Sequence, residues 1–504
     1  MVVGSTSGAG KSTVVTALCR ALALRGVEVA PFKAQNMSNH SAVTPDGGEI
    51  GRAQAMQAFA ARVETDRRMG PVLLKPSGAH TSHLVVLGEE VGTTDALGYG
   101  ARATSLRPLV LDALSSLRRE HGMVVLEGAG GAAEINLFER DVVNLPLAAA
   151  AGIPAVLVVD IERGGAFASA FGTWALLPPR LRSCLRGFVV NGFRGDVTLL
   201  DDGLRELTRR TGLPVLGVLP HLGDHVMLGE EDSLDLGAPG RPGGVAHTDR
   251  PVRVAVVRLP RLANPSDLDP LVLEPCVELR WATRPADLDD ADLVVLPGSR
   301  ATVLDLAWLR ERGLAEALGS LHPDVHVLGL CAGYQMLGDT VHDDLESGAG
   351  TVPGLRLLPV ETTFERPKVV RRSQGQVVGT ATPVSGYEIR WGRPRPRGGE
   401  PWLTLGTGAE GSDADAFEGC HAADGRVRGT SLHGVLDGDQ LRHALLEDVA
   451  RARGRRFVPG DVAYRAALEA HADHLAQWVE AHLDVGGLLA LAEGAAAPGE
   501  EPGW

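Results

Sequence analysis

The sequence predicts the α/β fold class, with two doubly wound domains in which helices cover both faces of a mostly parallel β-sheet. Short runs of β-branched residues alternate with amphipathic stretches through both halves of the chain. A stretch rich in glycine and proline, residues 237–250, separates the halves, and each half contains a glycine-rich strand-to-helix turn. The length of 504 residues is ample for two such domains.

The first half is expected to form a parallel sheet, because its apolar runs are short, rich in valine and separated by helical patterns. The expected strands are 27–32, 123–127, 154–160, 187–191 and 214–220. The expected helices are 11–25, 49–63, 165–177 and 198–211. These elements define a first domain at residues 1–236.

The second half shows the same alternation. Its expected strands are 252–257, 292–298, 325–330 and 426–434, and residues 438–484 form two helices that close the domain. We therefore assign 237–250 to a linker and 251–484 to the second domain. Residues 485–504 end without a core-forming pattern, and we expect them to be a disordered tail.

The composition excludes several classes of protein. A net charge of −14 disfavours a general nucleic-acid or membrane surface, and no apolar stretch is long enough to span a bilayer. The five cysteines are scattered without a C-x-x-C pair, which argues against a disulfide framework and a zinc site. We expect a cytoplasmic protein without nucleic-acid or membrane partners, and a homo-oligomer remains open.

The first chemical motif is "VVGSTSGAGKST" at residues 2–13, which predicts a phosphate-binding turn between a strand and a helix. Backbone N–H groups around Ser7, Gly8 and Gly10 would surround the phosphates of ATP. Lys11 would reach the outer phosphates and Ser12 would ligate Mg²⁺. Gly4 stands one position earlier than in the usual spacing, so this is a variant of the motif.

A metal-bound triphosphate also needs carboxylates. Glu127 is the best candidate for a second Mg²⁺ ligand, since it ends an expected strand and so lies at the carboxyl edge of the sheet. Asp46 and Glu49 are further candidates on a loop that enters a helix. Asp160 ends another expected strand, although for Asp46 and Asp160 a turn or capping role is as good an interpretation.

The second motif is "VLGLCAGYQML" at residues 327–337, where Cys331 lies at a strand-to-helix turn between Gly329 and Gly333. Small neighbours permit the strained backbone of a nucleophile elbow, and a helix N-terminus stabilises a thiolate. A buried structural cysteine is the commoner fate of this residue type. That alternative leaves the flanking glycines unexplained. We expect His433, in "GTSLHGVLD" at residues 429–437, to be the base.

These segments together with "LPGSR" at 296–300 resemble the class I, triad-type glutamine amidotransferases. The resemblance implies a flavodoxin-like domain in which Cys331 attacks the side-chain amide of L-glutamine and His433 moves the proton. It also implies that Gly298 and Ala332, with Gly333 beside them, form the oxyanion hole, and that Gln335 helps to hold glutamine. Many members have a glutamate where Val435 stands, so the group that orients His433 is left open.

The first half extends the resemblance to nearly the whole chain. The segments that carry it are "APFKAQNMSNH", "TPDGGEIGRAQAMQA", "PVLLKPSG", "LEGAGGAAEINL", "DIERGG" and "VNGFRGD". They resemble the cobyric acid synthase family, whose synthetase half is related to dethiobiotin synthetase. The family implies ATP- and glutamine-dependent amidation of adenosylcobyrinic acid a,c-diamide, a corrinoid, at its b, d, e and g carboxylates.

A polyanionic corrinoid requires local positive charge on an acidic protein. Only four of the 49 basic residues are lysines, so a lysine is expected where a compact ammonium is needed. Lys33 is the first candidate for substrate binding, Lys75 and Arg52 are weaker ones, and Asp141 is a further polar contact. One alternative is cobyrinic acid a,c-diamide synthase. The other is a MinD-like positioning ATPase, and this second alternative would leave Cys331 without a role.

Overall fold

The computed structural model describes residues 1–77, 81–223, 251–407, 416–497 and 502–504, so the predicted linker at 237–250 lies outside the described residues. The chain forms two compact units. Unit 1 contains Met1–Ser38, Gly48–Leu234 and Leu468–Trp504, and unit 2 contains Asn39–Gly47 and Asp235–Ala467. The predicted continuous domains therefore differ from the compact units at two places, residues 39–47 and the C-terminal region.

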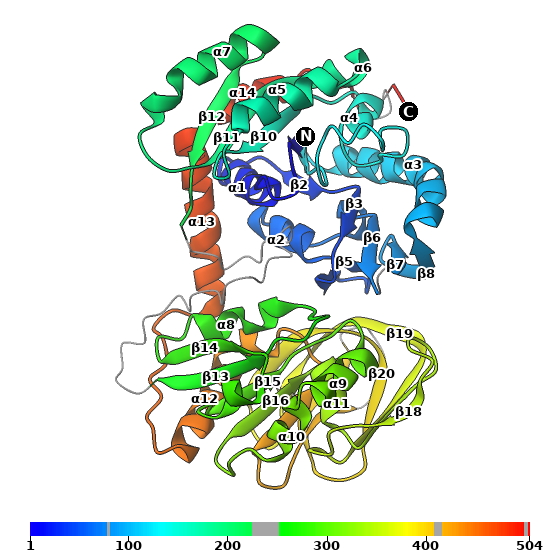
Figure 1. Cartoon of the computed structure of the whole chain (residues 1–504), viewed down its shortest axis with the longest axis vertical. Coiled ribbons are helices and arrows are strands. Elements are labelled where there is room, and N and C mark those ends of the chain that lie inside the picture. Colours follow the sequence, from blue (N-terminus) through cyan, green and yellow to red (C-terminus); the bar gives the residue numbers. More distant parts are fainter. Residues whose placement is uncertain (78–80, 224–250, 408–415, 498–501) are drawn as a thin grey trace. The chain divides into compact units, whose positions relative to one another are not determined.

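The main sheet of unit 1 is parallel, as predicted (Figure 1). Strands β1, β10, β11 and β12 lie side by side in that order, and β2 pairs with β9. An isolated parallel bridge between Val2 and Glu127 connects the two groups of strands. The bounds are β1 Val2–Gly4, β2 Val29–Phe32, β9 Met123–Leu126, β10 Ala155–Asp160, β11 Leu185–Phe193 and β12 Val215–Pro220.

Apolar side chains on α1 pack against this sheet and against two C-terminal helices, as the buried cluster of Val14, Leu18, Val156, Val479 and Val485 shows. Helix α5 packs against β10 and α7. The helices of unit 1 are α1 Lys11–Leu24, α2 Arg52–Ala60, α3 Ala96–Glu120, α4 Leu145–Ala151, α5 Ala166–Leu176, α6 Pro179–Arg182, α7 Asp201–Thr211 and α14 Val485–Ala492, with α13 Tyr464–His482 joining from Leu468 onward. Short 3-10 turns are η1 Arg67–Met69 and η2 Val197–Leu200.

Unit 1 also has a second sheet that the sequence did not predict. Strands β3, β6, β7 and β8 form it in that order, with β3 parallel to β6 and the rest antiparallel. Their bounds are β3 Gln35–Met37, β6 Val72–Pro76, β7 Thr81–Val86 and β8 Glu89–Asp95. Strand β5, Glu49–Gly51, occupies the start of the segment 49–63 that was expected to be wholly helical.

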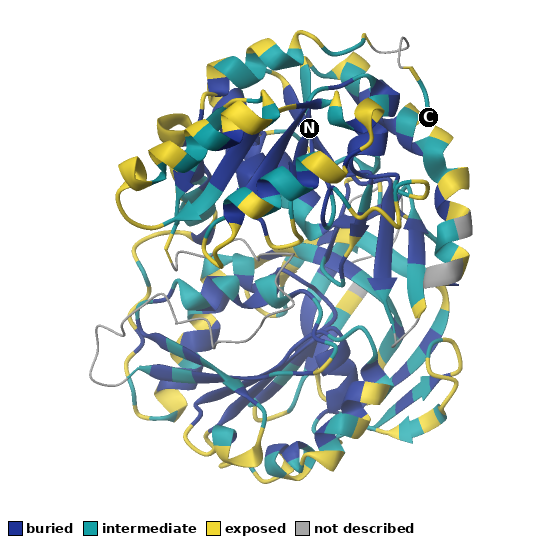
Figure 2. Ribbon diagram, turned by 45° about the horizontal axis from the view of Figure 1, so that its top comes forward, coloured by how far each residue is buried: buried dark blue, intermediate teal, exposed yellow. Residues whose placement is uncertain are grey.

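The parallel part of the unit 2 sheet has the order β14-β13-β15-β16-β23, which is the flavodoxin-like order 2-1-3-4-5. The valine- and leucine-rich strands are buried on both faces, as Figure 2 shows in dark blue. The bounds are β13 Val252–Val257, β14 Val277–Ala282, β15 Leu293–Leu296, β16 His326–Leu330 and β23 Val427–Thr430. The helices and 3-10 turns are η3 Pro265–Leu268, α8 Asp269–Val272, η4 Pro285–Leu288, α9 Thr302–Glu311, α10 Leu314–Gly319, α11 Ala332–Leu337, η5 Val435–Asp437 and α12 Asp439–Ala452.

A long extension continues this sheet beyond β23, and it is antiparallel except for the parallel pair of β17 and β19. Its two longest strands, β19 and β20, pair as a hairpin, seen in yellow in Figure 1. The bounds are β17 Thr340–Asp343, β18 Gly350–Pro353, β19 Val360–Val377, β20 Pro383–Pro396, β21 Glu400–Thr407 and β22 Ala416–His421, and strand β4, Ser41–Val43, also belongs to unit 2. The extension was not predicted, because its strands carry many arginines and lack a continuous apolar run.

The C-terminal predictions need correction. Helices α12 and α13 do form within 438–484, but α13 belongs to unit 1 from Leu468 onward. Residues Val485–Ala492 form α14 and contribute to the unit 1 core, so this part of the predicted tail is ordered. None of the helices among the described residues is long and apolar enough to cross a membrane.

A buried arginine on α1 connects this helix to α13 within unit 1. The guanidinium of Arg20 on α1 is almost fully buried and contacts Glu469 and Asp473 on α13, with Nε 2.6 Å from the Asp473 carboxylate. Arg25, the C-cap of α1, makes a 2.8 Å contact with Glu480, and both of these side chains are partly exposed. The acids of the two sites are similarly exposed, so the sites differ mainly in the burial of the arginine.

We predict that Arg20→Ala lowers the free energy of unfolding of unit 1 by about 2 kcal/mol, because it removes a buried guanidinium with two charge-assisted hydrogen bonds, while the two partly exposed carboxylates remain hydrated. The matched variant Arg25→Ala should cost no more than about 1 kcal/mol, since its pair is exposed. Urea unfolding, with hydrogen exchange of α13 peptides as a local readout, measures both values. Equal effects of the two variants would contradict the assigned role of Arg20.

Candidate active sites

Cys331 lies on a sharp turn between β16 and α11, as the sequence predicts. Its backbone has φ 51° and ψ −108°, a strained conformation for a residue with a side chain. The flanking glycines are required by close packing, since a Cβ at Gly333 would lie 1.8 Å from the Leu296 oxygen and one at Gly329 would lie 2.8 Å from the Tyr334 nitrogen. The turn places the thiol at the start of α11, with an exposed fraction of 7% for the residue.

His433 and Gly298 lie beside Cys331. A Cβ added to Gly298 would stand 3.1 Å from His433 Cε1 and 3.9 Å from Cys331 Cβ, so the backbone at 298 fits between the two side chains. His433 follows the end of β23 by three residues, rather than ending the strand as expected. Burial by itself would lower the pKa of His433. The charges of Asp267 and Cys331 and the hydrogen bonds with both raise it to about 10.

Asp267 is the residue that the sequence did not reveal. One of its carboxylate oxygens lies 2.7 Å from His433 Nδ1, and the other accepts a 2.9 Å hydrogen bond from the backbone N–H of Gly434. Both side chains of the pair are buried. Asp267 lies on η3, which follows β13, and 166 residues before His433. It therefore answers the question that Val435 left open, and its carboxylate can orient the imidazole and stabilise its charged form.

Strand β20 holds the other side of His433. The backbones of Tyr387 and His433 exchange two hydrogen bonds, of 3.0 and 2.8 Å, and the Tyr387 ring stacks on the imidazole with centroids 5.3 Å apart. The carbonyl of Ile389 on the same strand lies 4.0 Å from the Cys331 sulfur. The unpredicted antiparallel extension thus forms one wall of the site.

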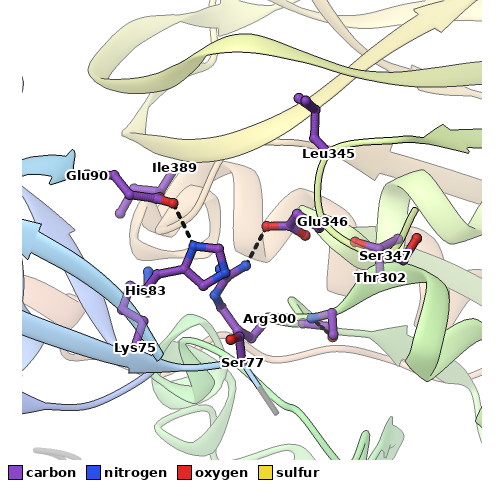
Figure 3. A network of polar contacts seen from close by, with 12 residues as sticks. Lys75, Ser77, His83, Glu90, Arg300, Thr302, Leu345, Glu346, Ser347 and Ile389 are labelled. Atoms are coloured by element: carbon purple, nitrogen blue, oxygen red, sulfur yellow. Dashed lines mark hydrogen bonds and ion pairs between the residues drawn. The ribbon is translucent and has the colours of Figure 1, made fainter. Parts of the chain in front are cut away.

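The residues implied for glutamine binding lie around the same turn. Ala332 is buried in the first turn of α11, next to Cys331. The Gln335 amide is buried as well, with its oxygen 3.4 Å from the Thr302 hydroxyl and its amide group packed against Gly392. Arg300, which follows the Gly298 loop, donates a 2.5 Å hydrogen bond to Glu346, shown by a dashed line in Figure 3.

The phosphate-binding motif in unit 1 forms the predicted strand, turn and helix. The ammonium of Lys11 donates to the carbonyl oxygens of Thr6, at 3.0 Å, and Ser7, at 2.7 Å. A Cβ at Gly4 would lie 2.9 Å from the Lys11 side chain, so the displaced glycine makes room for the lysine stem. Gly10 has φ +87° at the N-cap of α1. Ser7 and Gly8 are exposed, and a Cβ at Gly8 would meet no neighbour, so packing does not require that glycine.

Glu127 is fully buried at the carboxyl end of β9 and faces the start of α1. One carboxylate oxygen accepts hydrogen bonds of 2.8 Å from both Ser12 Oγ and Lys33 Nζ, and the other accepts one from the Gln57 amide. Burial alone would raise the pKa of the carboxyl. The charge of Lys33 and the three hydrogen bonds hold it below its usual value. Glu127 is therefore ionised at neutral pH.

Ser12 and Glu127 fit the requirements of a nucleotide-bound Mg²⁺. This ion is usually held by one or two carboxylates and the substrate phosphates, with several waters retained. The two oxygens are already within 2.8 Å of one another, and the carboxylate is charged. No group of three His, Cys, Asp or Glu side chains among the described residues could hold a metal by itself. A site here would thus depend on the nucleotide.

The other predicted metal ligands are not brought to this pair. Glu49 is buried in an ion pair with Lys75, the residue predicted to bind substrate. Asp46 is exposed, accepts a hydrogen bond from Thr44, and belongs to unit 2. Asp160 accepts a 2.9 Å hydrogen bond from the Glu162 backbone, which is the turn role given as its alternative. The metal roles of Asp46 and Glu49 stay predictions.

The remaining residues predicted to bind substrate differ in burial and in their contacts. Lys33 is buried against Glu127, and Arg52 is half-buried at the start of α2. Asp141 accepts hydrogen bonds from the backbones of Val143 and Asn144, so its carboxylate supports a turn.

Across the strand pair from Lys75, His83 lies in register and contacts Glu90 at 2.6 Å, as Figure 3 shows. His83 was not predicted. A lone histidine on a strand gives no sequence signal of its own.

Comparison with protein-family models assigns one known domain to each half. Residues 1–231 match the CobQ/CobB/MinD/ParA nucleotide binding domain, and residues 253–441 match the CobB/CobQ-like glutamine amidotransferase domain. A solved structure, PurLQS from Thermotoga maritima, matches 40% of this chain and 97% of its own with 18% identity and a TM-score of 0.30, a similarity too low to support any inference.

Curated relatives match over nearly the whole length. The cobyric acid synthase of Frankia casuarinae is 48% identical, over 99% of this chain and 97% of the relative. The cobyric acid synthase of Rhodococcus jostii is 49% identical, over 99% of this chain and 96% of the relative. That of Nocardia farcinica is 49% identical, over 96% of this chain and 94% of the relative.

We predict that Asp267→Asn lowers kcat for glutamine hydrolysis by roughly 10²- to 10⁴-fold with little change in KM, because the neutral amide no longer stabilises the imidazolium. Steady-state release of glutamate measures both constants. Asp292→Asn is the matched control, since Asp292 is a buried carboxylate of the same unit that is held by Arg453 and Arg455. An equal loss of kcat in the control would show that Asp267 acts only through stability.

Proposed function

Because the chain belongs to the cobyric acid synthase family, we propose that it amidates the b, d, e and g carboxylates of adenosylcobyrinic acid a,c-diamide and releases adenosylcobyric acid. The chain is a glutamine-dependent amidoligase of cobalamin biosynthesis that uses ATP. The observation that best supports the proposed reaction is that one chain holds both a Cys331–His433–Asp267 group and a Lys11–Ser12–Glu127 group, while the choice of acceptor rests on the full-length cobyric acid synthase relatives. The first can release ammonia and the second can activate a carboxylate.

Ammonia release begins at the thiolate of Cys331, whose charge is balanced by the protonated His433. The sulfur attacks the amide carbon of glutamine, and the oxygen of that amide becomes an oxyanion beside the N–H groups of Gly298 and Ala332. His433 then gives its proton to the departing nitrogen, so that ammonia leaves and a thioester remains. Asp267 keeps the imidazole oriented throughout.

Hydrolysis of the thioester regenerates the site. A water molecule loses a proton to the now neutral His433 and attacks the thioester carbon. The carbon–sulfur bond breaks, glutamate leaves, and the thiolate and imidazolium are restored. Each cycle thus consumes one glutamine and one water and yields one glutamate and one ammonia.

Carboxylate activation takes place in unit 1. An oxygen of the acceptor carboxylate attacks the γ-phosphorus of ATP, and the bond to ADP breaks to leave an acyl phosphate. Ammonia then attacks the acyl carbon, loses a proton and expels phosphate, which gives a carboxamide. In the phosphate-bound enzyme, the ammonium of Lys11 would exchange the Thr6 and Ser7 carbonyls for phosphate oxygens, and so stabilise the developing charge.

The proposed Mg²⁺ would be held by Ser12 and Glu127, and it would neutralise charge on the transferring phosphoryl group. Lys33 then shares the Glu127 carboxylate with the ion, which suits a role in setting the charge of the nucleotide site. Binding of the corrinoid by Lys33, Lys75, Arg52 and Asp141 remains a prediction, as do the cytoplasmic location and the absence of nucleic-acid and membrane partners.

The alternatives are less well supported. The full-length relatives are cobyric acid synthases, which speaks against the a,c-diamide synthase. The nucleotide-binding match includes MinD, but a positioning ATPase would not need the amidotransferase half.

We predict that the wild-type chain with ATP, Mg²⁺, glutamine and adenosylcobyrinic acid a,c-diamide adds four amide groups, counted as mass changes of the corrinoid. Cys331→Ala should lose at least about 10³-fold of the glutamine-dependent rate, because the nucleophile is gone, but keep amidation with free ammonia. Lys11→Ala should lose both, because the acyl phosphate no longer forms.

The two nitrogen sources serve as controls for one another, since free ammonia bypasses unit 2 chemistry. Two amides added to cobyrinic acid, with no turnover of the a,c-diamide, would identify the sister activity. Full glutamine-dependent activity of Cys331→Ala would show that the nucleophile is wrongly assigned.

A further inference from the structure

A short segment between two unit 1 strands belongs to unit 2. The chain leaves unit 1 after Ser38, contributes Asn39–Gly47 to unit 2, and returns at Gly48. Ser41 and Thr44 within the segment have no exposed surface. An ordinary surface loop would have its polar backbone groups in water. This segment is instead packed and hydrogen-bonded inside unit 2.

The segment binds one residue of unit 2 from two directions. Asn264 donates its backbone N–H to His40 Nδ1 at 3.2 Å, and its side-chain oxygen accepts a 2.9 Å hydrogen bond from the backbone N–H of Ser41. The first contact requires an unprotonated Nδ1 on His40. Both bonds connect neighbouring residues of the segment to the same asparagine, so they fix its backbone and its side chain together.

Asn264 is a strained position at the start of the turn that carries Asp267. It has φ 51° and ψ 55°, the left-handed conformation, and it is the N-cap of η3. Its carbonyl accepts a 3.1 Å hydrogen bond from the Asp267 backbone N–H, and the preceding residue, Ala263, donates a 3.0 Å hydrogen bond to the Gly298 carbonyl. The turn therefore touches both the acid that orients His433 and the loop implied in the oxyanion hole.

The far end of the segment is attached to the antiparallel extension. Arg372 on β19 donates a 2.8 Å hydrogen bond to the Val43 carbonyl, and Gly47 lies close to the Val370 carbonyl. The neighbouring strand β20 carries Tyr387, which stacks on His433. The segment is thus attached at one end to the turn that carries Asp267 and at the other to the strands that carry Tyr387. Both of these residues contact His433.

We propose that residues 39–47 are a positioning element of the glutaminase site, with His40 and Ser41 acting through Asn264 to hold Asp267 against His433. The inference rests on the proposed function of Cys331 and His433. His40 and Ser41 hold Asn264, and Asn264 holds the turn that carries Asp267. Asp267 in turn contacts the imidazole of His433. Loosening the contact should let Asp267 sample positions away from His433 and lower kcat without changing glutamine binding.

The experiment compares two loss variants with a restoring one. His40→Ala removes the acceptor, and Asn264→Gly removes the side-chain contact but tolerates the left-handed backbone. We expect each to lower kcat for glutamine hydrolysis about 10-fold, the effect of about one lost hydrogen bond, with KM unchanged. His40→Asn returns an uncharged acceptor close to the Nδ1 position and should restore kcat to within about twofold.

Two controls separate positioning from general damage. His342→Ala removes a histidine of the same unit that contacts the Thr351 hydroxyl and the Asp344 carboxylate, and it should leave kcat unchanged. Amidation with free ammonia should be equal in all variants. An unchanged kcat in His40→Ala, or a loss that His40→Asn does not restore, would overturn the proposal. A wild-type chain that does not hydrolyse glutamine would instead overturn the proposed function.

Discussion

The contact between the Asp267 carboxylate and the His433 imidazole is the interaction on which the amidotransferase unit depends. Both groups are buried, and a buried charge is costly unless it is paired and hydrogen-bonded. Here the carboxylate is satisfied by His433 Nδ1 on one oxygen and by the Gly434 N–H on the other. The imidazole also has a hydrogen bond with Cys331, and together these contacts raise its pKa to about 10. The acid, the base and the nucleophile therefore come from three separate segments of the chain. The contacts of His433 with Asp267 and with Cys331 connect these segments.

In the nucleotide-binding unit, the buried carboxylate of Glu127 is likewise paired and hydrogen-bonded. Glu127 is surrounded by Ser12, Lys33 and Gln57, which hold the carboxylate in its charged form without any metal. The pair is therefore ready to accept a cation that arrives with its phosphates. Lys75 on β6 and Glu49 on β5 form a second buried pair of this kind. Two of the four lysines thus each compensate a buried carboxylate.

Much of the fold and of the site could be predicted because the signals are local. The elbow at Cys331 and the phosphate turn at Lys11 each combine a strand, glycines and a helix within a dozen residues. The glycines are required by contacts that a Cβ would violate, as at Gly333 and Gly4. The valine-rich parallel strands were recognisable for the same reason, since burial on both faces leaves a continuous apolar run.

The parts that escaped prediction depend on contacts between distant segments. Asp267 gives no signal, because its partner lies 166 residues away and an Asp after a Pro-Ser pair is typical of any turn. Helix α13 joins unit 1 through its apolar face in the core and through the Arg20 contact with its acids, and no local pattern reveals either partner. The segment 39–47 is similar, since its membership of unit 2 follows from Asn264 and Arg372.

The most direct test is an NMR titration of His433 in protein labelled with ¹³C-histidine, assigned by comparison with His433→Gln. The contacts with Asp267 and Cys331 predict a pKa of about 10 for this imidazole, so its resonance should remain that of the charged form through neutral pH. A titration midpoint at or below 6.5, the ordinary value for histidine, would mean that Asp267 and Cys331 do not outweigh the effect of burial on His433, and it would contradict the account.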